Sequence, residues 1–114
     1  MKYLLAIVLL FSSGHASAYL YITGSNLLKY CELQNNKGGS CLDYVMGVKN
    51  TYDTFVDLEM VGKSMCLPVN AEAGQLVRIV TKYLQEHPKD LHYRASDLVI
   101  PALTAAFPCE PVSE

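Results

Sequence analysis

The chain has 114 residues, of which 11 are acidic and 9 basic, and its net charge is −2. A chain of this length fits one domain with a modest core. The slight acidic balance argues against a surface that follows nucleic-acid phosphates, because such a surface needs clustered lysines and arginines. We therefore expect no nucleic acid among its partners.

The first 18 residues have the pattern of a secretory signal peptide. Lys2 supplies a positive start, residues 4–11 form an apolar run too short to cross a bilayer, and Ala16-Ser17-Ala18 offers small residues for cleavage. Cleavage after Ala18 would leave residues 19–114 as one exported domain with no membrane attachment, since no second apolar stretch of bilayer length follows. A retained amphipathic anchor is the alternative interpretation of this segment.

Helical spacing dominates the rest of the chain, and the best strand signal, residues 19–22, is weak. The first predicted helix has Ser25 or Asn26 as its N-cap and ends before residues 35–39, which favour turns. The second begins with Ser40 as N-cap and stops at Gly62. The expected buried positions of these two helices are Leu27, Leu28, Cys31, Leu33, Cys41, Val45, Val48, Tyr52, Phe55 or Val56, and Met60.

The third predicted helix begins near Asn70 and closes at His87-Pro88, because the residue before a proline is disfavoured in a helix. Asp90 is expected to cap a fourth helix, which Pro101 should kink or split by removing one backbone hydrogen bond. The sequence thus predicts an all-α fold, a small disulfide-bonded bundle of about four helices. The expected buried positions of the last two helices are Ala73, Leu76, Val77, Val80, Leu84, Leu91, Ala95, Leu98, Ala102 and Ala106.

Four cysteines follow the leader, and export favours their oxidation. Antiparallel helices with short connections place Cys31 and Cys41 at one turn and bring Cys109 back beside Cys66. Of the three ways to pair four cysteines we expect 31 with 41 and 66 with 109, contributing about 3 and about 4 kcal/mol by chain entropy. Four reduced thiols or a zinc site are the alternatives, but no pair has the close spacing of a zinc knuckle.

Signals for catalysis are weak. With every cysteine bridged the chain has no thiol nucleophile, and it contains neither a Gly-x-Ser-x-Gly elbow nor a glycine-rich phosphate loop. His87 and His92 are separated by Pro88 and lack the one-turn spacing of a helical metal pair. We therefore expect no catalytic residue, no cofactor and no metal. A hydrolase that uses Asp43, Asp57 or His92 stays open as an alternative, although no spacing supports a dyad.

Short motifs across the mature chain occur in a distinctive order. They are Gly24-Ser25-Asn26-Leu27-Leu28, Cys31, Cys41-Leu42-Asp43-Tyr44, Gly47-Val48, Cys66-Leu67-Pro68, Gln75-Leu76-Val77, Tyr83-Leu84, His87-Pro88, Leu91-His92, Ala95, Ala102-Leu103 and Ala106-Phe107-Pro108-Cys109. In this order the chain resembles the Rap/Tai family of periplasmic immunity proteins, most specifically from Gln75 to Cys109. Two residues depart from that pattern. Asp43 stands in place of a glycine, and Pro101 stands inside a helix that the family leaves unbroken.

The resemblance implies a helical, disulfide-bonded periplasmic protein, often a homodimer, that neutralises a type VI secretion effector. The implied effector is a peptidoglycan amidase with a catalytic cysteine and histidine, and a rigid surface that covers its cleft would block it without catalysis. Loops 35–39, 59–64 and 86–90 are the candidate contacts, because loops on rigid scaffolds often carry recognition. A small periplasmic acid-stress chaperone is the alternative function. The candidate partner-binding residues are Asn36, Lys37, Lys63, Glu86, His87, Lys89 and Asp90.

Overall fold

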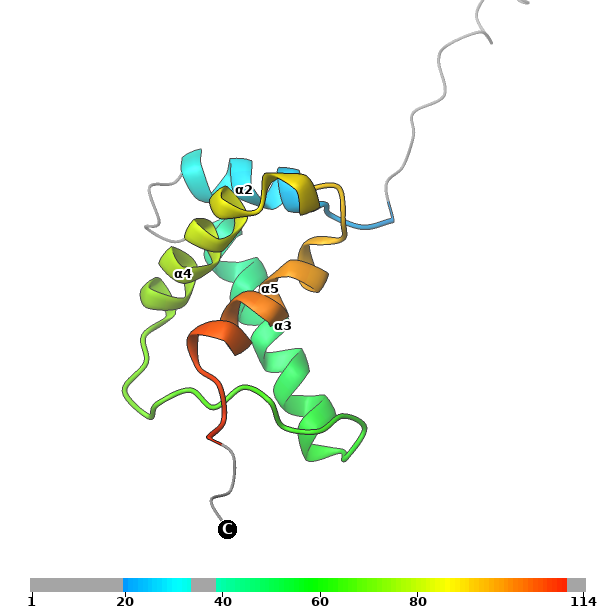
Figure 1. Cartoon of the computed structure of the whole chain (residues 1–114), viewed down its shortest axis with the longest axis vertical. Coiled ribbons are helices and arrows are strands. Elements are labelled where there is room, and N and C mark those ends of the chain that lie inside the picture. The colour runs from blue at the N-terminus through cyan, green and yellow to red at the C-terminus, as the bar shows by residue number, and fades with distance from the viewer. Residues whose placement is uncertain (1–19, 34–38, 111–114) are drawn as a thin grey trace, which may run out of the picture.

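A computed structural model describes residues 20–33 and 39–110 of the chain. The predicted signal peptide and the candidate contact residues Asn36 and Lys37 lie outside these ranges. The regular structure of the described residues is helical, which confirms the expected all-α fold (Figure 1). Its elements are α2 (Gly24–Leu33), α3 (Ser40–Asp57), α4 (Ala73–Glu86), the short 3₁₀ helix η2 (Pro88–Asp90) and α5 (Ala95–Ala106).

The four α-helices bury one common apolar core, and every pair of them is in contact. Each helix contributes a stripe of residues three or four apart, because such residues share a face. Three side chains expected inside are instead exposed, Leu33, Met60 and Ala106, and of the alternatives Phe55 and Val56 it is Val56 that packs against the core. The buried core consists of Leu27, Cys31, Cys41, Val45, Tyr52, Met65, Leu76, Val77, Val80, Leu84, Ala95, Leu98, Val99, Ala102 and Leu103.

The N-cap of α2 is Thr23, so the prediction of Ser25 or Asn26 is wrong. The Asn26 N–H donates to Thr23 Oγ1 at 3.2 Å, and the Thr23 N–H donates to Asn26 Oδ1 at 3.2 Å. This reciprocal pair is a capping box, with an asparagine at the third helical position. The N–H groups of the two residues between them donate outside the helix: Gly24 N–H to Tyr93 O and Ser25 N–H to Leu91 O, both at 2.9 Å. Tertiary contacts therefore set the start of this helix.

Gly24 is buried where α2 meets the segment before α5. A methyl group added at Gly24 would collide with Leu98 Cδ1 and would lie 3.1 Å from Leu91 Cα and 3.2 Å from Leu91 O. A leucine side chain can turn aside, but the backbone of residue 91 is held by its hydrogen bonds to Ser25. This close approach explains why a glycine stands in the first turn of α2.

We expect Gly24→Ala to lower the free energy of unfolding by about 2 kcal/mol, because the added methyl group overpacks a backbone contact. Urea unfolding followed by circular dichroism measures the change. Gly74→Ala is the control, since a methyl group at Gly74 would meet only Arg78 Nη1 at an ordinary 3.6 Å. An unfolding free energy of Gly24→Ala equal to that of the unmodified protein would show that α2 can shift to make room.

The fourth helix differs from prediction at its start. Asp90 belongs to η2 and does not cap α5, which begins at Ala95 after an extended Arg94 (φ −58°, ψ 136°). Arg94 is extended because it pairs with Thr23 in an isolated bridge, and the Ala95 N–H donates to Ile22 O at 2.7 Å. The helix is not split at Pro101 but continues through it to Ala106. Pro101 is exposed, so water can solvate the carbonyl group that the ring leaves without a partner.

Two disulfides close the fold, Cys31 with Cys41 and Cys66 with Cys109, and in both the Cα atoms lie 4.9 Å apart. This is the pairing expected from the antiparallel order of the helices. Cys31 and Cys41 are fully buried between α2 and α3, whereas Cys66 and Cys109 are half-buried. The second bridge ties the connection after α3 to the end of the chain just beyond α5.

Candidate interaction surface

Four exposed apolar side chains gather where α3 ends: Phe55, Leu58, Met60 and Val61, with exposed fractions of 42, 63, 65 and 43%. We call these four residues the tip. Figure 1 shows that this end of α3 extends beyond the other helices. A small domain rarely exposes several large apolar residues together unless they contact a partner. The tip is therefore the leading candidate for an interaction surface.

The backbone at the tip is held in a defined shape. The Met60 N–H donates to Phe55 O at 2.9 Å and the Glu59 N–H donates to Val56 O at 3.0 Å. These two bonds form a Schellman motif, in which the residue after the C-cap takes a left-handed conformation. That residue is Glu59, with φ 58°. The helix thus ends at Asp57 and not at Gly62 as predicted, and a glutamate occupies the position that usually favours glycine.

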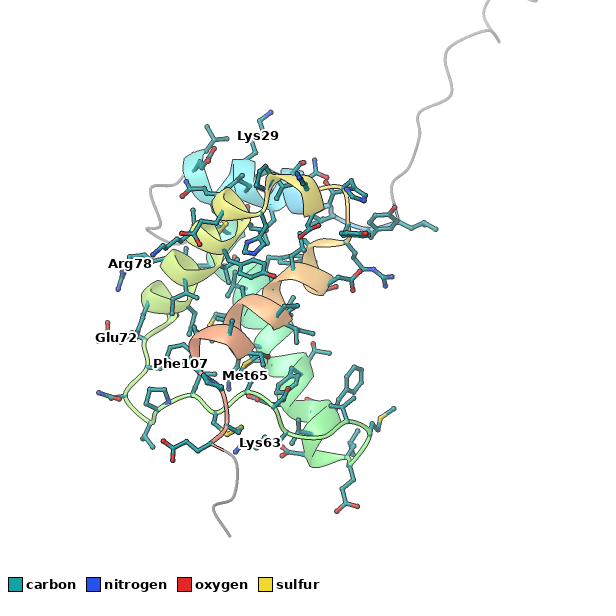
Figure 2. All side chains as sticks on the ribbon, in the orientation of Figure 1. Lys29, Lys63, Met65, Glu72, Arg78 and Phe107 are labelled. Carbon is teal, nitrogen blue, oxygen red and sulfur yellow. A yellow bond between two sulfur atoms is a disulfide. The ribbon has the colours of Figure 1, made fainter. Side chains whose placement is uncertain are left out.

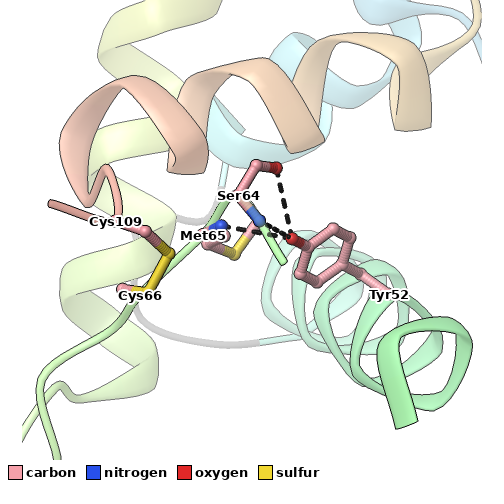
Figure 3. The surroundings of a disulfide bond; sticks show 5 residues. All are labelled: Tyr52, Ser64, Met65, Cys66 and Cys109. Carbon is pink, nitrogen blue, oxygen red and sulfur yellow. Dashed lines mark hydrogen bonds between the residues drawn. A yellow bond between two sulfur atoms is a disulfide. The ribbon is translucent and has the colours of Figure 1, made fainter. Parts of the chain in front are cut away.

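Tyr52 fixes the chain on its return from the tip. Its ring is buried, and its hydroxyl oxygen accepts hydrogen bonds from the N–H groups of Ser64 at 2.7 Å and Met65 at 3.1 Å (Figure 3). Ser64 Oγ lies 3.2 Å from the same oxygen. The next residue is Cys66, which is bonded to Cys109 and donates its N–H to Phe107 O at 2.8 Å. The segment after the tip is therefore anchored both to α3 and to the chain after α5.

These contacts also perturb the Tyr52 phenol. Burial by itself raises the pKa of Tyr52, but the hydrogen bonds from the Ser64 side chain and from the N–H groups of Ser64 and Met65 outweigh it, so that the pKa lies below the ordinary 10.0. In the unfolded chain the pKa returns to about 10. Between the two values the unfolded chain binds more protons than the folded one, so the contribution of Tyr52 to the free energy of unfolding rises with pH there.

We expect Tyr52→Phe to abolish the phenol that ionises first in an ultraviolet absorbance titration of the folded protein. At neutral pH the same change should lower the free energy of unfolding by about 2 kcal/mol, because two backbone N–H groups lose their acceptor. Tyr30→Phe is the control, because Tyr30 is exposed and forms no comparable contact. An early-ionising phenol that persists in Tyr52→Phe would contradict this reading of the hydrogen bonds.

An open groove of about 710 Å³ runs between α3 and α5 and reaches the tip. It shares Phe55 and Val61 with the tip, and among the described residues Asp43 is the only charged one that lines it. Most of its surface is apolar or carries hydroxyl groups. The complete lining is Asp43, Tyr44, Gly47, Val48, Thr51, Tyr52, Phe55, Val61, Gly62, Ser64, Ser96 and Ile100.

The structure separates the two candidate loops that it describes. Exposed Lys63 lies next to the tip (Figure 2), whereas residues 86–90 lie at the other end of the molecule beside α2 (Figure 1). His87 is half-buried: its ring stacks on Tyr83 with centroids 3.9 Å apart, and its Nδ1 lies 2.6 Å from Tyr83 O. These contacts give His87 a structural role at the end of α4. Of the other candidates there, Glu86 and Lys89 are exposed and Asp90 is half-buried.

The carboxylates considered for catalysis do not come together. Asp43 lies in the first turn of α3 and Asp57 is its last residue, so they are separated by about 21 Å along the helix axis. His92 is exposed and packs against the ring of Tyr93, with centroids 4.1 Å apart. Within residues 20–33 and 39–110, no group of three or more metal-binding side chains is clustered. No helix in these ranges has the length and apolarity needed to cross a membrane.

Loop 59–64 was a candidate contact, but the sequence did not reveal the apolar tip as a unit, since Phe55 or Val56, and Met60, were assigned to the buried stripe. One signal could have revealed it: Phe55, Val56, Leu58, Met60 and Val61 are apolar within seven positions, more than one face of a helix end can bury. A family model described as Rap1a immunity proteins matches residues 23–109. Comparisons with curated proteins and with solved structures give no significant match.

Proposed function

The chain belongs to the Rap1a immunity protein family, and from this membership we propose that it binds and inhibits a type VI secretion effector in the periplasm. The proposed effector is a peptidoglycan amidase whose catalytic cysteine and histidine lie in a cleft. The protein acts as a stoichiometric inhibitor and performs no reaction itself. Export through residues 1–18 as a signal peptide and the presence of two disulfides are consistent with this compartment.

The observation that carries the proposal is the exposed apolar tip on an anchored segment. Leu58, Met60 and Val61 are exposed and follow the end of α3, which extends beyond the other helices (Figure 1). Such a convex group fits a concave cleft better than a flat helix face does. Apolar side chains that become buried at the centre of an interface supply most of its binding energy. Covering the cleft in this way would keep the cell-wall peptide from the effector's cysteine.

Anchoring of the tip makes this binding efficient. The Schellman motif holds one side of the tip, and Tyr52 and the Cys66–Cys109 disulfide hold the other. Little conformational freedom is then lost when the effector docks, and less of the contact energy is spent on ordering the loop. Lys63, two positions after Val61, is part of the proposed contact surface, whereas the exposed residues Glu86 and Lys89 lie at the other end of the molecule.

We propose that the protein inhibits the effector as a homodimer, as the family resemblance suggests. Tyr21 and Ile22, which precede α2, and Tyr30, on α2, are exposed and line one shallow pocket, at the other end of the molecule from the tip. Pairing through this apolar group would leave both tips free for effectors. Light scattering of the purified mature protein measures the mass, and a strictly monomeric protein at micromolar concentration would remove this part of the proposal.

The test of the proposed function is inhibition of an amidase effector encoded next to this protein. We expect the oxidised mature protein to stop hydrolysis of purified peptidoglycan at one copy per effector. The double variant Leu58→Ala/Met60→Ala should bind at least about tenfold more weakly, because each side chain contributes an apolar contact. Val69→Ala, an exposed apolar change outside the tip, should bind normally. Undiminished hydrolysis in the presence of excess protein would refute the function.

A further inference from the structure

The groove between α3 and α5 is a second feature that the fold leaves open. Its volume of about 710 Å³ is within the range of sites that bind small ligands or side chains. Along α3 it extends from Asp43 to Phe55, about 18 Å of helix. An extended segment of about five residues covers that length.

Gly47 lies in the middle of α3, where glycine is a poor helix former. No contact with the described residues requires it there, because a methyl group added at Gly47 would meet none of their atoms within 4 Å. Gly24, in contrast, is required by the close backbone of Leu91. The absence of a side chain at Gly47 leaves the α3 backbone open to the groove.

The charge of the groove indicates what that molecule carries. Asp43 is exposed at the end of the groove near α5 and forms no ion pair or side-chain hydrogen bond with the described residues. The opposite end is apolar, with Phe55 and Val61. A complementary segment has a lysine or arginine at one end, to reach Asp43, and a large apolar side chain toward the other.

We propose that this groove binds a segment of about five residues of the effector, extended along α3 over Gly47, with a basic side chain on Asp43 and an apolar side chain near Phe55. This inference rests on the proposed function for the identity of the occupant. The groove is continuous with the tip, so one effector molecule contacts both. The tip covers the cleft, and the groove selects the effector by its basic and apolar pattern.

Calorimetry that measures the affinity of groove variants for the effector tests the inference. Gly47→Leu should weaken binding by about tenfold or more, because its side chain occupies the groove. Gly47→Ala should bind more weakly while its Tm rises by about 4 °C, since alanine favours the helix. Asp43→Asn should lose about threefold in affinity at low salt and nothing at high salt. Gly74→Ala should leave affinity unchanged. If Gly47→Leu binds the effector as tightly as the unmodified protein does, the inference is overturned.

A peptide experiment does not depend on the effector. Five-residue peptides with arginine at one end and leucine or phenylalanine at the other, in both chain directions, are titrated into ¹⁵N-labelled mature protein. We expect shifts of the Gly47 and Thr51 amide signals, larger than with glutamate in place of arginine. Equal shifts with glutamate, or no shifts, would count against the groove. Concentration-dependent shifts of the Gly47 and Thr51 signals without peptide would assign the groove to a second copy and overturn the choice of occupant.

The two experiments separate the proposals. If Leu58→Ala/Met60→Ala loses inhibition while every groove variant keeps it, the function stands and the groove inference falls. If the amidase is not inhibited at all but the arginine peptides shift Gly47 and Thr51, the groove is a binding site and the proposed function falls.

Discussion

Replacing Cys66 and Cys109 together with serine is expected to lower the free energy of unfolding by about 4 kcal/mol, because the bridge closes a long loop. The two cysteines are 43 positions apart in sequence, so the crosslink restricts the unfolded chain strongly. A small domain has little stability to spare. We therefore expect the variant to be partly unfolded at body temperature, and its tip to lose one of its anchors.

Urea denaturation of the double variant measures this loss, and the variant Cys31→Ser/Cys41→Ser is the comparison. The Cys31–Cys41 disulfide closes a loop between residues only 10 positions apart, for which chain entropy predicts a contribution of about 3 kcal/mol. Both of its sulfur atoms are in the core, however, so serine there adds the cost of burying hydroxyl groups. A loss below about 1 kcal/mol on removing Cys66–Cys109 would mean that the hydrogen bonds of Tyr52 and Phe107 hold the segment without it.

Leu84→Ala is expected to lower the free energy of unfolding by about 3 kcal/mol, since it removes a fully buried side chain and leaves a cavity. Leu84 lies on the buried stripe of α4, which, like the other helices, contacts all three of its neighbours. The core cannot close around the gap without moving Val77 or Val80, which are equally buried. Thermal unfolding should show a correspondingly lower midpoint.

The matched control is Gln85→Ala on the same helix. Gln85 is exposed, and its amide makes one long contact with Glu32 at 3.4 Å. Its loss should change the free energy of unfolding by no more than about 0.5 kcal/mol. Equal destabilisation by the two substitutions would show that α4 is held by its surface contacts and not by the core.

Sequence periodicity predicted the parts of the fold that depend on one helix alone. In α4 the expected stripe of Leu76, Val77, Val80 and Leu84 is the buried stripe, because three- and four-residue spacing defines a helical face. The disulfide pairing followed from the antiparallel order of the helices. Helix ends were less predictable: the start of α5 depends on the bridge between Thr23 and Arg94, which joins residues far apart in sequence.

The interaction surface was only partly predictable for a related reason. Spacing placed Phe55 or Val56, and Met60, on the same face as Val45 and Tyr52. Val56 is half-buried on α3, whereas Met60 lies beyond Asp57, the last residue of the helix. Whether that face is covered depends on the length of the neighbouring helices, and α3 extends past them (Figure 1). Loop 59–64 was among the candidates because loops often carry recognition, but its apolar character and its anchoring by Tyr52 required the three-dimensional structure.

The separation of the tip from the core bears on how this protein can evolve. Leu58, Met60 and Val61 contribute nothing to the buried core, and the segment that carries them is anchored on both sides by residues outside it. Mutations at these positions therefore change folding stability little. A lineage in conflict with a diversifying toxin can exchange these side chains in successive generations while the bundle beneath stays intact.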